Sequence, residues 1–321
     1  MLFPDAMRVD RLDALPASHL DALAAAGLYG APAPAEIGGL GLDLRQLSAV
    51  AEELASGSLT TAFVWIQHFR LLMTLAVGGA PAALRDRWLA SACRGTTRGG
   101  IALTGLMPGP AALRAEPAAG GWQLDGAAPW VTGWGLIDLL LVVARGPGDT
   151  VVTLIMDATD QPGLTVTRQR LAAVDASVTV RLGFDGVQVP QARFAGQEPF
   201  DPAASSQPAA LRVNGSLALG VARRCCRLLG SGPLDEELTA CRERLDDALE
   251  ADAAAMALAR ADASELAVRA TAALAVRDGS SSITTASHAQ RLAREAVFLL
   301  VFGSRPAIKA ALLRKLGAAS R

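Results

Sequence analysis

The sequence predicts an α+β protein in which helical segments flank a central run of strands. Over residues 1–97 apolar residues recur at helical spacing, and from Gly99 onward their period changes to two. After a segment rich in Pro, Ala and Ser near residue 200, helical spacing returns. We therefore expect an N-terminal helical domain (1–97), a central β domain (98–200) and a C-terminal helical bundle (201–321).

Composition limits the kinds of partner that the chain can have. The 321 residues are 51% hydrophobic but only 4% aromatic, which favours close-packed helices rich in Ala and Leu. Thirty Lys and Arg residues nearly balance 31 Asp and Glu residues, so no net field would attract nucleic acid. The four cysteines show no Cys-x-x-Cys spacing, so we predict no metal site.

We expect a cytoplasmic protein without a secretory signal or a membrane-spanning segment. Its first ten residues lack a basic segment followed by an apolar core. Residues 59–77 come nearest to a membrane span, but Gln67, His68 and Arg70 lie in the middle of this run. Because charges are costly in hydrocarbon, we predict a buried helix there and no membrane partner.

The N-terminal domain should contain helices separated by one glycine-rich loop. Apolar spacing predicts a helix over residues 12–28, and residues 33–42 read as the loop. Asp43 followed by Gln46 predicts the start of a second helix, a buried helix follows from Thr60, and Pro81 begins another.

The central domain should be a β-sandwich or barrel of about 100 residues, because many short strands alternate with turns. The predicted strands are 101–104, 112–115, 121–124, 130–132, 137–144, 151–156, 164–167, 178–184 and 187–189. A linker over 198–207 then leads to five predicted helices. These are 211–229, 234–260, 262–277, 287–302 and 306–316, with Asp262 as a helix cap.

Three motifs lie in the order that one known family shows. A hairpin runs from Gly126 through Trp130, Val131 and Thr132 to Gly133, close to a Gly-x-Lys-x-Trp-Ile-Thr-Asn pattern. Residues 34–41 read Pro-x-x-x-Gly-Gly-x-Gly, and residues 184–190 read Phe-x-x-Val-x-Val-Pro. On these motifs the chain resembles the acyl-CoA dehydrogenase family over nearly its whole length, which implies the acyl-CoA dehydrogenase fold.

The resemblance implies FAD as the cofactor and names the residues that would contact it. In the family the hairpin tryptophan flanks the flavin ring and the threonine hydrogen-bonds near its reactive nitrogen, which here are Trp130 and Thr132. Leu103, Thr104 and Gly109 belong to a segment resembling the cofactor loop Thr-Glu-Pro-x-x-Gly-Ser-Asp. The serine and the acid of that loop are replaced by Pro110 and Ala111.

The family's cofactor contacts across a subunit interface are also altered. Arg227 is the candidate for an arginine that reaches the cofactor pyrophosphate of the neighbouring subunit, although the phenylalanine of that motif is absent. A later Gly-Gly-x-Gly segment has become Ser280, Ser281 and Ser282. The cofactor loop and both interface motifs therefore depart from the family.

The family's catalytic base is missing from its usual place. That base is a glutamate in a Tyr-Glu-Gly-Thr turn, and residues 291–296 resemble the Arg-x-x-Arg-Asp-Ala segment before it. Phe302 occupies the glutamate's position, and phenylalanine cannot accept a proton. The first bundle helix, where some relatives place the base, offers Arg212 and Asn214 but no carboxylate.

Two other carboxylates, Asp201 and Glu295, are candidates for the base, against the alternative that each is solvated or salt-bridged. The catalytic residue is therefore not assigned from sequence.

Three functions stay open from the sequence. The first is an FAD-dependent acyl-CoA dehydrogenase-like enzyme that acts on an acyl-CoA or acyl-carrier thioester, or a related substrate, with an unusual base or none. The second is a non-catalytic or half-active subunit of a heteromeric dehydrogenase. The third is a flavin-dependent monooxygenase or oxidase, since fold alone does not decide function. The apolar run 297–300 favours a homo-oligomer, or a hetero-oligomer with a related subunit.

Overall fold

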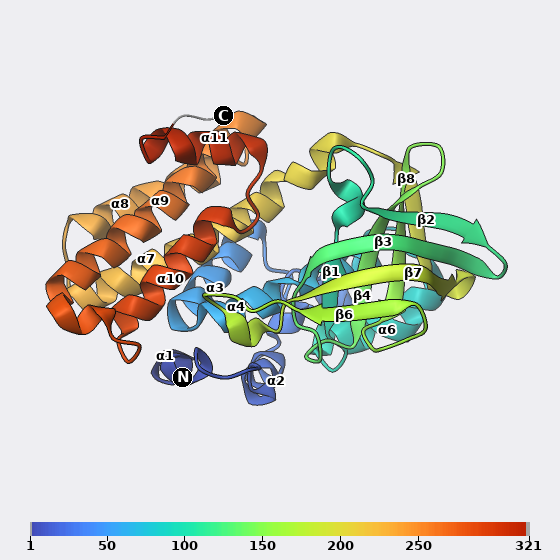
Figure 1. Cartoon of the computed structure of the whole chain (residues 1–321), viewed down its shortest axis with the longest axis horizontal. Coiled ribbons are helices and arrows are strands. Elements are labelled where there is room, and N and C mark those ends of the chain that lie inside the picture. The colour runs from blue at the N-terminus through green and yellow to red at the C-terminus, as the bar shows by residue number, and fades with distance from the viewer. Residues whose placement is uncertain (1, 319–321) are drawn as a thin grey trace.

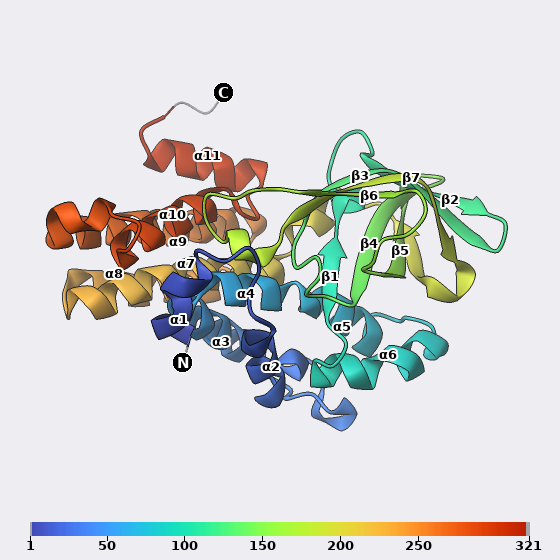
Figure 2. The same ribbon diagram turned by 60° about the horizontal axis from the view of Figure 1, so that its bottom comes forward.

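The computed structural model describes residues 2–318 of the chain. Figure 1 shows the C-terminal helices at one end of an elongated molecule and the strands at the other, with the N-terminal helices beside both. The turned view in Figure 2 places α5 (His68–Ala76) and α6 (Ala82–Arg94) below the strands. The other N-terminal helices are α1 (Leu2–Val9), α2 (Ala17–Ala25), α3 (Leu44–Gly57) and α4 (Leu59–Ile66).

The N-terminal helices differ from the sequence prediction in two places. The predicted helix over 12–28 is the shorter α2, and the preceding residues, for which no helix was predicted, form α1. Tertiary contacts stabilise α1. The Phe3 ring stacks on His288 with centroids 4.3 Å apart, and the Arg224 guanidinium lies 3.9 Å from the Phe3 centroid. Such contacts with distant residues leave no local pattern in the sequence.

One local prediction for this region is confirmed. Asp43 caps α3 through a reciprocal pair of hydrogen bonds with Gln46, as its spacing indicates. The apolar run from residue 59, predicted as one buried helix, instead divides into α4 and α5, with Gln67 between them. Among residues 2–318, no helix combines the length and apolar character needed to cross a bilayer.

The strands form one eight-stranded sheet. Its hydrogen-bonded path runs β6-β7-β3-β2-β4-β5-β8, and β1 pairs in parallel with β4. Buried side chains of β2, β3, β4, β5 and β7 make one apolar core. The strands are β1 (Gly99–Ala102), β2 (Leu113–Ala118), β3 (Gly121–Val131), β4 (Leu139–Gly146), β5 (Thr150–Asp157), β6 (Leu164–Arg168), β7 (Val180–Pro190) and β8 (Phe194–Pro199).

Two pairs of predicted short strands are each one long strand. The segments 121–124 and 130–132 belong to β3 and its end, and 178–184 and 187–189 belong to β7. The two long strands pair with each other, with register shifts between Leu124 and Gly126 and between Ala128 and Val131. Gly126 and Pro129 therefore bend a continuous strand instead of ending it.

In the C-terminal bundle, the break between the second and third helices lies between Asp247 and Ala253, earlier than the predicted break at residue 261. Its helices are α7 (Pro208–Leu229), α8 (Pro233–Asp247), α9 (Ala253–Asp278), α10 (His288–Val301) and α11 (Pro306–Lys315). Asp252 caps α9 by accepting a hydrogen bond from the Ala255 amide at 2.8 Å. Asp262, the predicted cap, instead lies within α9 and pairs with Arg244 and Lys315. The helix continues past Asp262 because Ala261 and Ala263 are buried in the bundle core.

Close contacts join the N-terminal helices to the other two groups of elements. A Cβ atom at Gly220 of α7 would lie 2.5 Å from the Glu52 carbonyl oxygen of α3, so the two helices approach at a residue without a side chain. On the sheet side, the Gly99 amide donates to Nδ1 of His68 at 3.0 Å. Burial lowers the pKa of His68 to about 4, so this imidazole is neutral at pH 7.

Candidate functional site

The end of β3 carries the two residues that the sequence placed nearest a cofactor ring. Trp130 is 64% exposed although it belongs to a paired strand, and Thr132, just past the strand end, is 5% exposed. Val131 between them is fully buried in the sheet core. An exposed indole two residues from a hydroxyl group is a surface on which a flat aromatic molecule can stack and accept a hydrogen bond.

The segment between β6 and β7, residues 169–179, holds this strand end by hydrogen bonds. The Gly133 amide donates to the Ser177 carbonyl at 2.9 Å, and the Trp134 amide donates to the Val178 carbonyl at 3.1 Å. The Thr132 hydroxyl lies 3.1 Å from the hydroxyl of Thr179. Thr132 is therefore held through its side chain and through the backbone that follows it.

The cofactor loop predicted from Leu103, Thr104 and Gly109 follows β1. Leu103 and Thr104 are partly exposed, and residues 104–106 form a short 3₁₀ turn that contacts β3. Gly109 has φ of 94°, and no atom lies within 4 Å of the position that a Cβ would take. The loop therefore leaves backbone accessible at Gly109, just after a turn that contacts β3.

Arg145, which the sequence did not single out as a site residue, holds this loop in place. Its guanidinium donates to the carbonyl oxygens of Gly105 and Met107 at 3.4 and 3.2 Å. The same group lies 3.4 Å from the centroid of Phe200, so its flat face is covered. The only sequence signal was an arginine ending an otherwise apolar strand.

The end of α10 is built differently from the end of β3. The Phe302 ring lies edge-on to Phe63 at 4.9 Å and stacked on Phe298 at 5.4 Å between centroids. The turn is tight, because a Cβ at Gly303 would come 2.7 Å from the Asn214 side-chain nitrogen. The position predicted to lack the catalytic glutamate is thus a packed aromatic cluster.

Buried Arg260 completes this junction, and the sequence gave no sign of it. Its guanidinium donates to the carbonyl oxygens of Leu299 and Phe302, each at 3.3 Å, and also to the Ser264 hydroxyl. Burial lowers the pKa of Arg260 to about 10, so the group is still charged at pH 7. A cation at the C-terminal end of α10 satisfies carbonyl groups that the helix leaves open.

Both alternative carboxylates have structural partners. Asp201 is exposed and accepts a hydrogen bond from the Ala203 amide at 2.9 Å. Glu295 is 3% exposed and pairs with Arg291 one turn earlier on α10. Burial raises the pKa of Glu295, and the Arg291 charge opposes that effect. Neither carboxylate lies at the Phe302 turn in sequence. Arg291 bonds one oxygen of Glu295, and the other oxygen is buried without a hydrogen-bond partner in the part of the chain that the structure describes.

Arg227, the predicted pyrophosphate contact, is engaged within its own chain. Its two terminal nitrogens donate to the two carboxylate oxygens of Glu53 on α3, at 2.9 and 3.0 Å. The pairing lowers the pKa of Glu53. To reach a phosphate, the Arg227 guanidinium would have to break both hydrogen bonds with Glu53.

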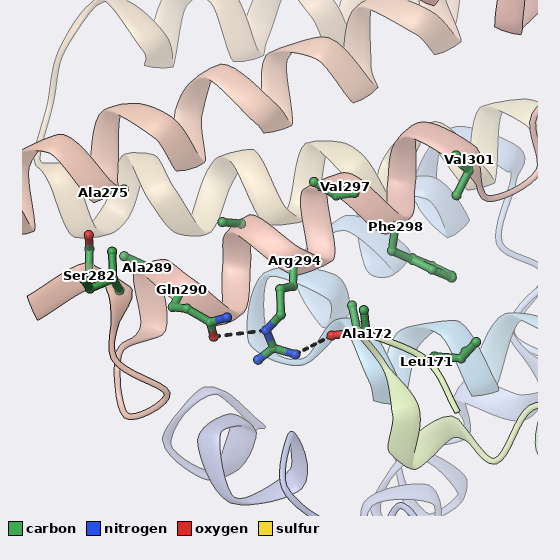
Figure 3. Close-up of a pocket in the computed structure, with 13 residues that line it drawn as sticks. Leu171, Ala172, Ala275, Ser282, Ala289, Gln290, Arg294, Val297, Phe298 and Val301 are labelled. Atoms are coloured by element: carbon green, nitrogen blue, oxygen red, sulfur yellow. Dashed lines mark hydrogen bonds between the residues drawn. The ribbon is translucent and has the colours of Figure 1, made fainter. Parts of the chain in front are cut away.

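An apolar groove of about 630 Å³ lies along α10. Figure 3 shows Arg294 at its middle, bonded to Gln290 and to the Ala172 carbonyl, with Phe298 and Val301 toward one end. Neither Trp130 nor Thr132 lines it. Among residues 2–318 no cluster of His, Cys, Asp and Glu could hold a metal ion.

Comparisons with known proteins place this geometry in context. Residues 1–96 match the family model described as acyl-CoA dehydrogenase, N-terminal domain. Benzylmalonyl-CoA dehydrogenase of Aromatoleum aromaticum is 31% identical over 229 residues, which cover 68% of this chain and 60% of that protein. Other curated relatives are matched over about half of their length, so the chain spans less than two thirds of the relatives it resembles.

Solved structures extend the likeness to nearly the whole chain. A glutaryl-coenzyme A dehydrogenase in complex with glutaryl-CoA aligns with a TM-score of 0.83 and 19% identity, covering 99% of this chain and 92% of that one. PigA with FAD and proline aligns with a TM-score of 0.81 and 20% identity, covering 98% and 93%. The predicted fold class, helices followed by a central sheet and a helical bundle, is therefore confirmed.

Proposed function

Because this chain belongs to the acyl-CoA dehydrogenase family, we propose that it is an FAD-dependent oxidoreductase with a non-standard or absent catalytic base. Its proposed substrate is an acyl-CoA or acyl-carrier thioester, or a related molecule. The observation that carries the proposal is the exposed Trp130, followed two residues later by the Thr132 hydroxyl. FAD, when bound, supplies the hydride acceptor, and the protein supplies orientation and proton transfer.

The residues at the end of β3 fit the ring of FAD. The 64% exposed indole offers an apolar face, the adjacent hydroxyl of Thr132 offers a donor, and the loop at Gly109 leaves backbone open. The phosphate side fits less well, because Pro110 and Ala111 replace polar residues and Arg227 is paired with Glu53. These residues favour binding through the ring more than through the phosphates.

The proton that must leave the substrate has no acceptor in this chain at the usual place. Phe302 contributes an apolar wall with Phe63 and Phe298, which excludes water but cannot take a proton. Asp201 and Glu295 are occupied by structural partners. We therefore propose that the base is supplied by a partner subunit or by the substrate, or that the reaction needs none.

The same observations support two alternative functions. Loss of polar residues on the phosphate side favours a half-active subunit that completes its cofactor site in a hetero-oligomer with a related chain. Loss of the base favours a flavin monooxygenase or oxidase, in which oxygen reacts with the reduced ring. A gene for a complete relative beside this one would favour the former, and a gene for a flavin reductase the latter.

The absorption spectrum of the protein purified alone tests the proposal, with the released cofactor identified after denaturation. Stoichiometric FAD is the expected result. Failure to bind FAD both as purified and after incubation with excess FAD would contradict a site that this chain forms alone. In that case the same measurement on the chain mixed with a complete relative separates the hetero-oligomer from loss of the site.

Replacing Phe302 by glutamate tests the position of the missing base. We expect Phe302→Glu to gain oxidation of acyl-CoA substrates, measured by reduction of an artificial electron acceptor across a panel of chain lengths. Val301→Glu, at the neighbouring residue that is 70% exposed, is the matched control and should gain nothing. Bound FAD with no gain for Phe302→Glu across the panel would count against either the alignment of the turn or the thioester substrate.

A further inference from the structure

Three buried hydroxyl groups form a chain behind the exposed end of β3. The Ser177 hydroxyl lies 3.0 Å from that of Thr179, and the Thr179 hydroxyl lies 3.1 Å from that of Thr132. Thr132 is 5% exposed, Thr179 2% and Ser177 not at all. Within the described residues, the side chains of these three residues form hydrogen bonds only with one another.

The direction of the hydrogen bonds in this chain follows from counting donors. Three hydroxyl groups carry three hydrogens, but the chain contains only two hydrogen bonds, so one hydrogen has no acceptor inside it. If the bonds ran from Thr132 toward Ser177, the spare hydrogen would lie on the fully buried Ser177. If both ends donated to Thr179, its own hydrogen would be buried without an acceptor. Because an unsatisfied buried donor is costly, both arrangements are disfavoured.

Only one arrangement puts the spare hydrogen where a ligand or water can accept it. When Ser177 donates to Thr179 and Thr179 donates to Thr132, the free hydrogen belongs to Thr132. This residue keeps the most exposure of the three and follows the exposed Trp130 by two residues. The chain therefore has a preferred polarity that ends at the proposed ring site.

The backbone that carries Ser177 and Thr179 is strained. Val174 and Val178 both lie in the left-handed region, with φ of 53° and 51°, which is unfavourable for residues branched at Cβ. Surrounding hydrogen bonds hold the segment: the Leu15 amide donates to the Ala176 carbonyl at 2.7 Å, and the Leu171 amide to the Asp175 carboxylate at 2.8 Å. Strain that is so fully supported marks a segment whose shape serves a purpose.

We infer that Thr179 and Ser177 are positioning residues, which orient the Thr132 hydroxyl so that it donates its hydrogen to an acceptor atom on the ring of a bound flavin. The identity of the acceptor rests on the proposed function. The polarity of the hydroxyl chain does not, because it follows from the protein alone.

The polarity can be tested without any cofactor. In the inferred direction, Thr132→Val removes the acceptor of the Thr179 hydrogen and leaves that donor buried and unpaired. Ser177→Ala removes only a donor. We expect Thr132→Val to lower the midpoint of thermal unfolding by roughly 2–6 °C more than Ser177→Ala does. Equal losses, or a larger loss for Ser177→Ala, would overturn the polarity.

A triple variant gives a second, independent measurement of the same point. Thr179→Val and Ser177→Ala, introduced together into the Thr132→Val protein, remove both remaining buried hydroxyl groups, so they should recover part of the lost midpoint. Further loss of midpoint in the triple variant would contradict the inference.

The positioning role is tested on the flavin-loaded protein. Thr179→Val should weaken FAD binding by roughly three- to tenfold and shift the visible absorption band of the bound flavin, because the hydrogen bond is no longer oriented. Thr179→Ser keeps the hydroxyl and should restore both. Thr167→Val, at an exposed position on β6, is the matched control and should change neither. An unchanged spectrum and affinity in Thr179→Val would refute the positioning role.

The two kinds of failure are distinguishable. If the wild-type protein takes up no FAD, the proposed function fails while the unfolding measurements still decide the polarity. If FAD binds but Ser177→Ala lowers the unfolding midpoint more than Thr132→Val does, the inferred polarity is wrong while the proposed function stands.

Discussion

The end of β3 and the end of α10 are the two places where the family would put a cofactor ring and a catalytic base, and they are built in opposite ways. At β3 an indole is left 64% exposed, and the Thr132 side chain two residues later bonds, among residues 2–318, only to Thr179. At α10 the Phe302 ring packs on Phe63 and Phe298, and Arg260 donates to the carbonyl oxygens of Leu299 and Phe302. An aromatic ring left open to solvent indicates binding, whereas a ring packed among other rings indicates a structural role.

The contrast also separates stability from function. Because Trp130 contributes little burial to the folded chain, its exposure is a cost that only a ligand or partner would remove. Phe302 belongs to the apolar packing of the bundle. We therefore expect substitutions at β3 to affect binding, and substitutions at α10 to affect unfolding.

The largest expected effect is a loss of stability at low pH, and it arises at His68, which joins α5 to β1 away from both ends. Burial lowers the pKa of His68 from 6.5 to about 4, so the unfolded chain binds a proton that the folded chain rejects between these values. The neutral His68 ring should make its full contribution to the free energy of unfolding above pH 6.5. That free energy should decline by up to about 3 kcal/mol as the pH falls toward 4.

Denaturant unfolding at pH 7 and at pH 4.5 measures this effect. His68→Gln has no titrating ring, so its stability should fall less than that of the wild-type protein over the same interval. Equal declines in the two proteins would show that His68 is not the group responsible.

Removing the Phe302 ring should come next in size. Phe302→Ala takes an aromatic ring from the cluster with Phe63 and Phe298 and should lower the free energy of unfolding by about 2 kcal/mol, less than for a fully buried ring because Phe302 is partly exposed. Its affinity for FAD should stay unchanged. Val301→Ala, 70% exposed, is the control and should cost under about 0.5 kcal/mol. A large loss of FAD affinity in Phe302→Ala would break the contrast between the two ends.

Removing the Trp130 ring should have the converse result. Trp130→Ala should weaken FAD binding by roughly tenfold or more, equivalent to about 1.4 kcal/mol, while the unfolding of the cofactor-free protein changes little. Trp130→Phe should retain part of the affinity, and Val77→Ala, at another exposed apolar residue, should retain all of it. Titration with FAD followed by fluorescence measures these affinities, and full affinity in Trp130→Ala would remove Trp130 from the site.

The smallest effect concerns the strained segment behind β3. Asparagine tolerates the left-handed region better than valine, so Val178→Asn should raise the free energy of unfolding by about 1 kcal/mol. Val180→Asn, in β7 with ordinary strand geometry, should instead destabilise the protein because Val180 is buried. A loss of stability in Val178→Asn would mean that the segment is not strained there.

Local patterns predicted most elements, and the exceptions have tertiary causes. The Asp43 cap and the change of period near Gly99 depend on neighbouring residues, so they are legible in the sequence. The break between α8 and α9 was misplaced at Asp262, because burial of Ala261 and Ala263 in the bundle core keeps Asp262 inside α9 and no local pattern records that burial. Helix α1 was missed because its stability depends on contacts with α7 and α10.

The sequence by itself determined the order of helices and strands, the likeness to one family, the candidate ring residues Trp130 and Thr132, and the absence of a glutamate at Phe302. These follow from residue identity and spacing along the chain. The tertiary structure decided which groups are paired and which are free. It paired Arg227 with Glu53, buried Arg260 under Phe302 and joined Thr132 to Thr179. These pairings join residues that are 42 to 174 positions apart in the sequence and meet only in the folded chain, so no local pattern records them.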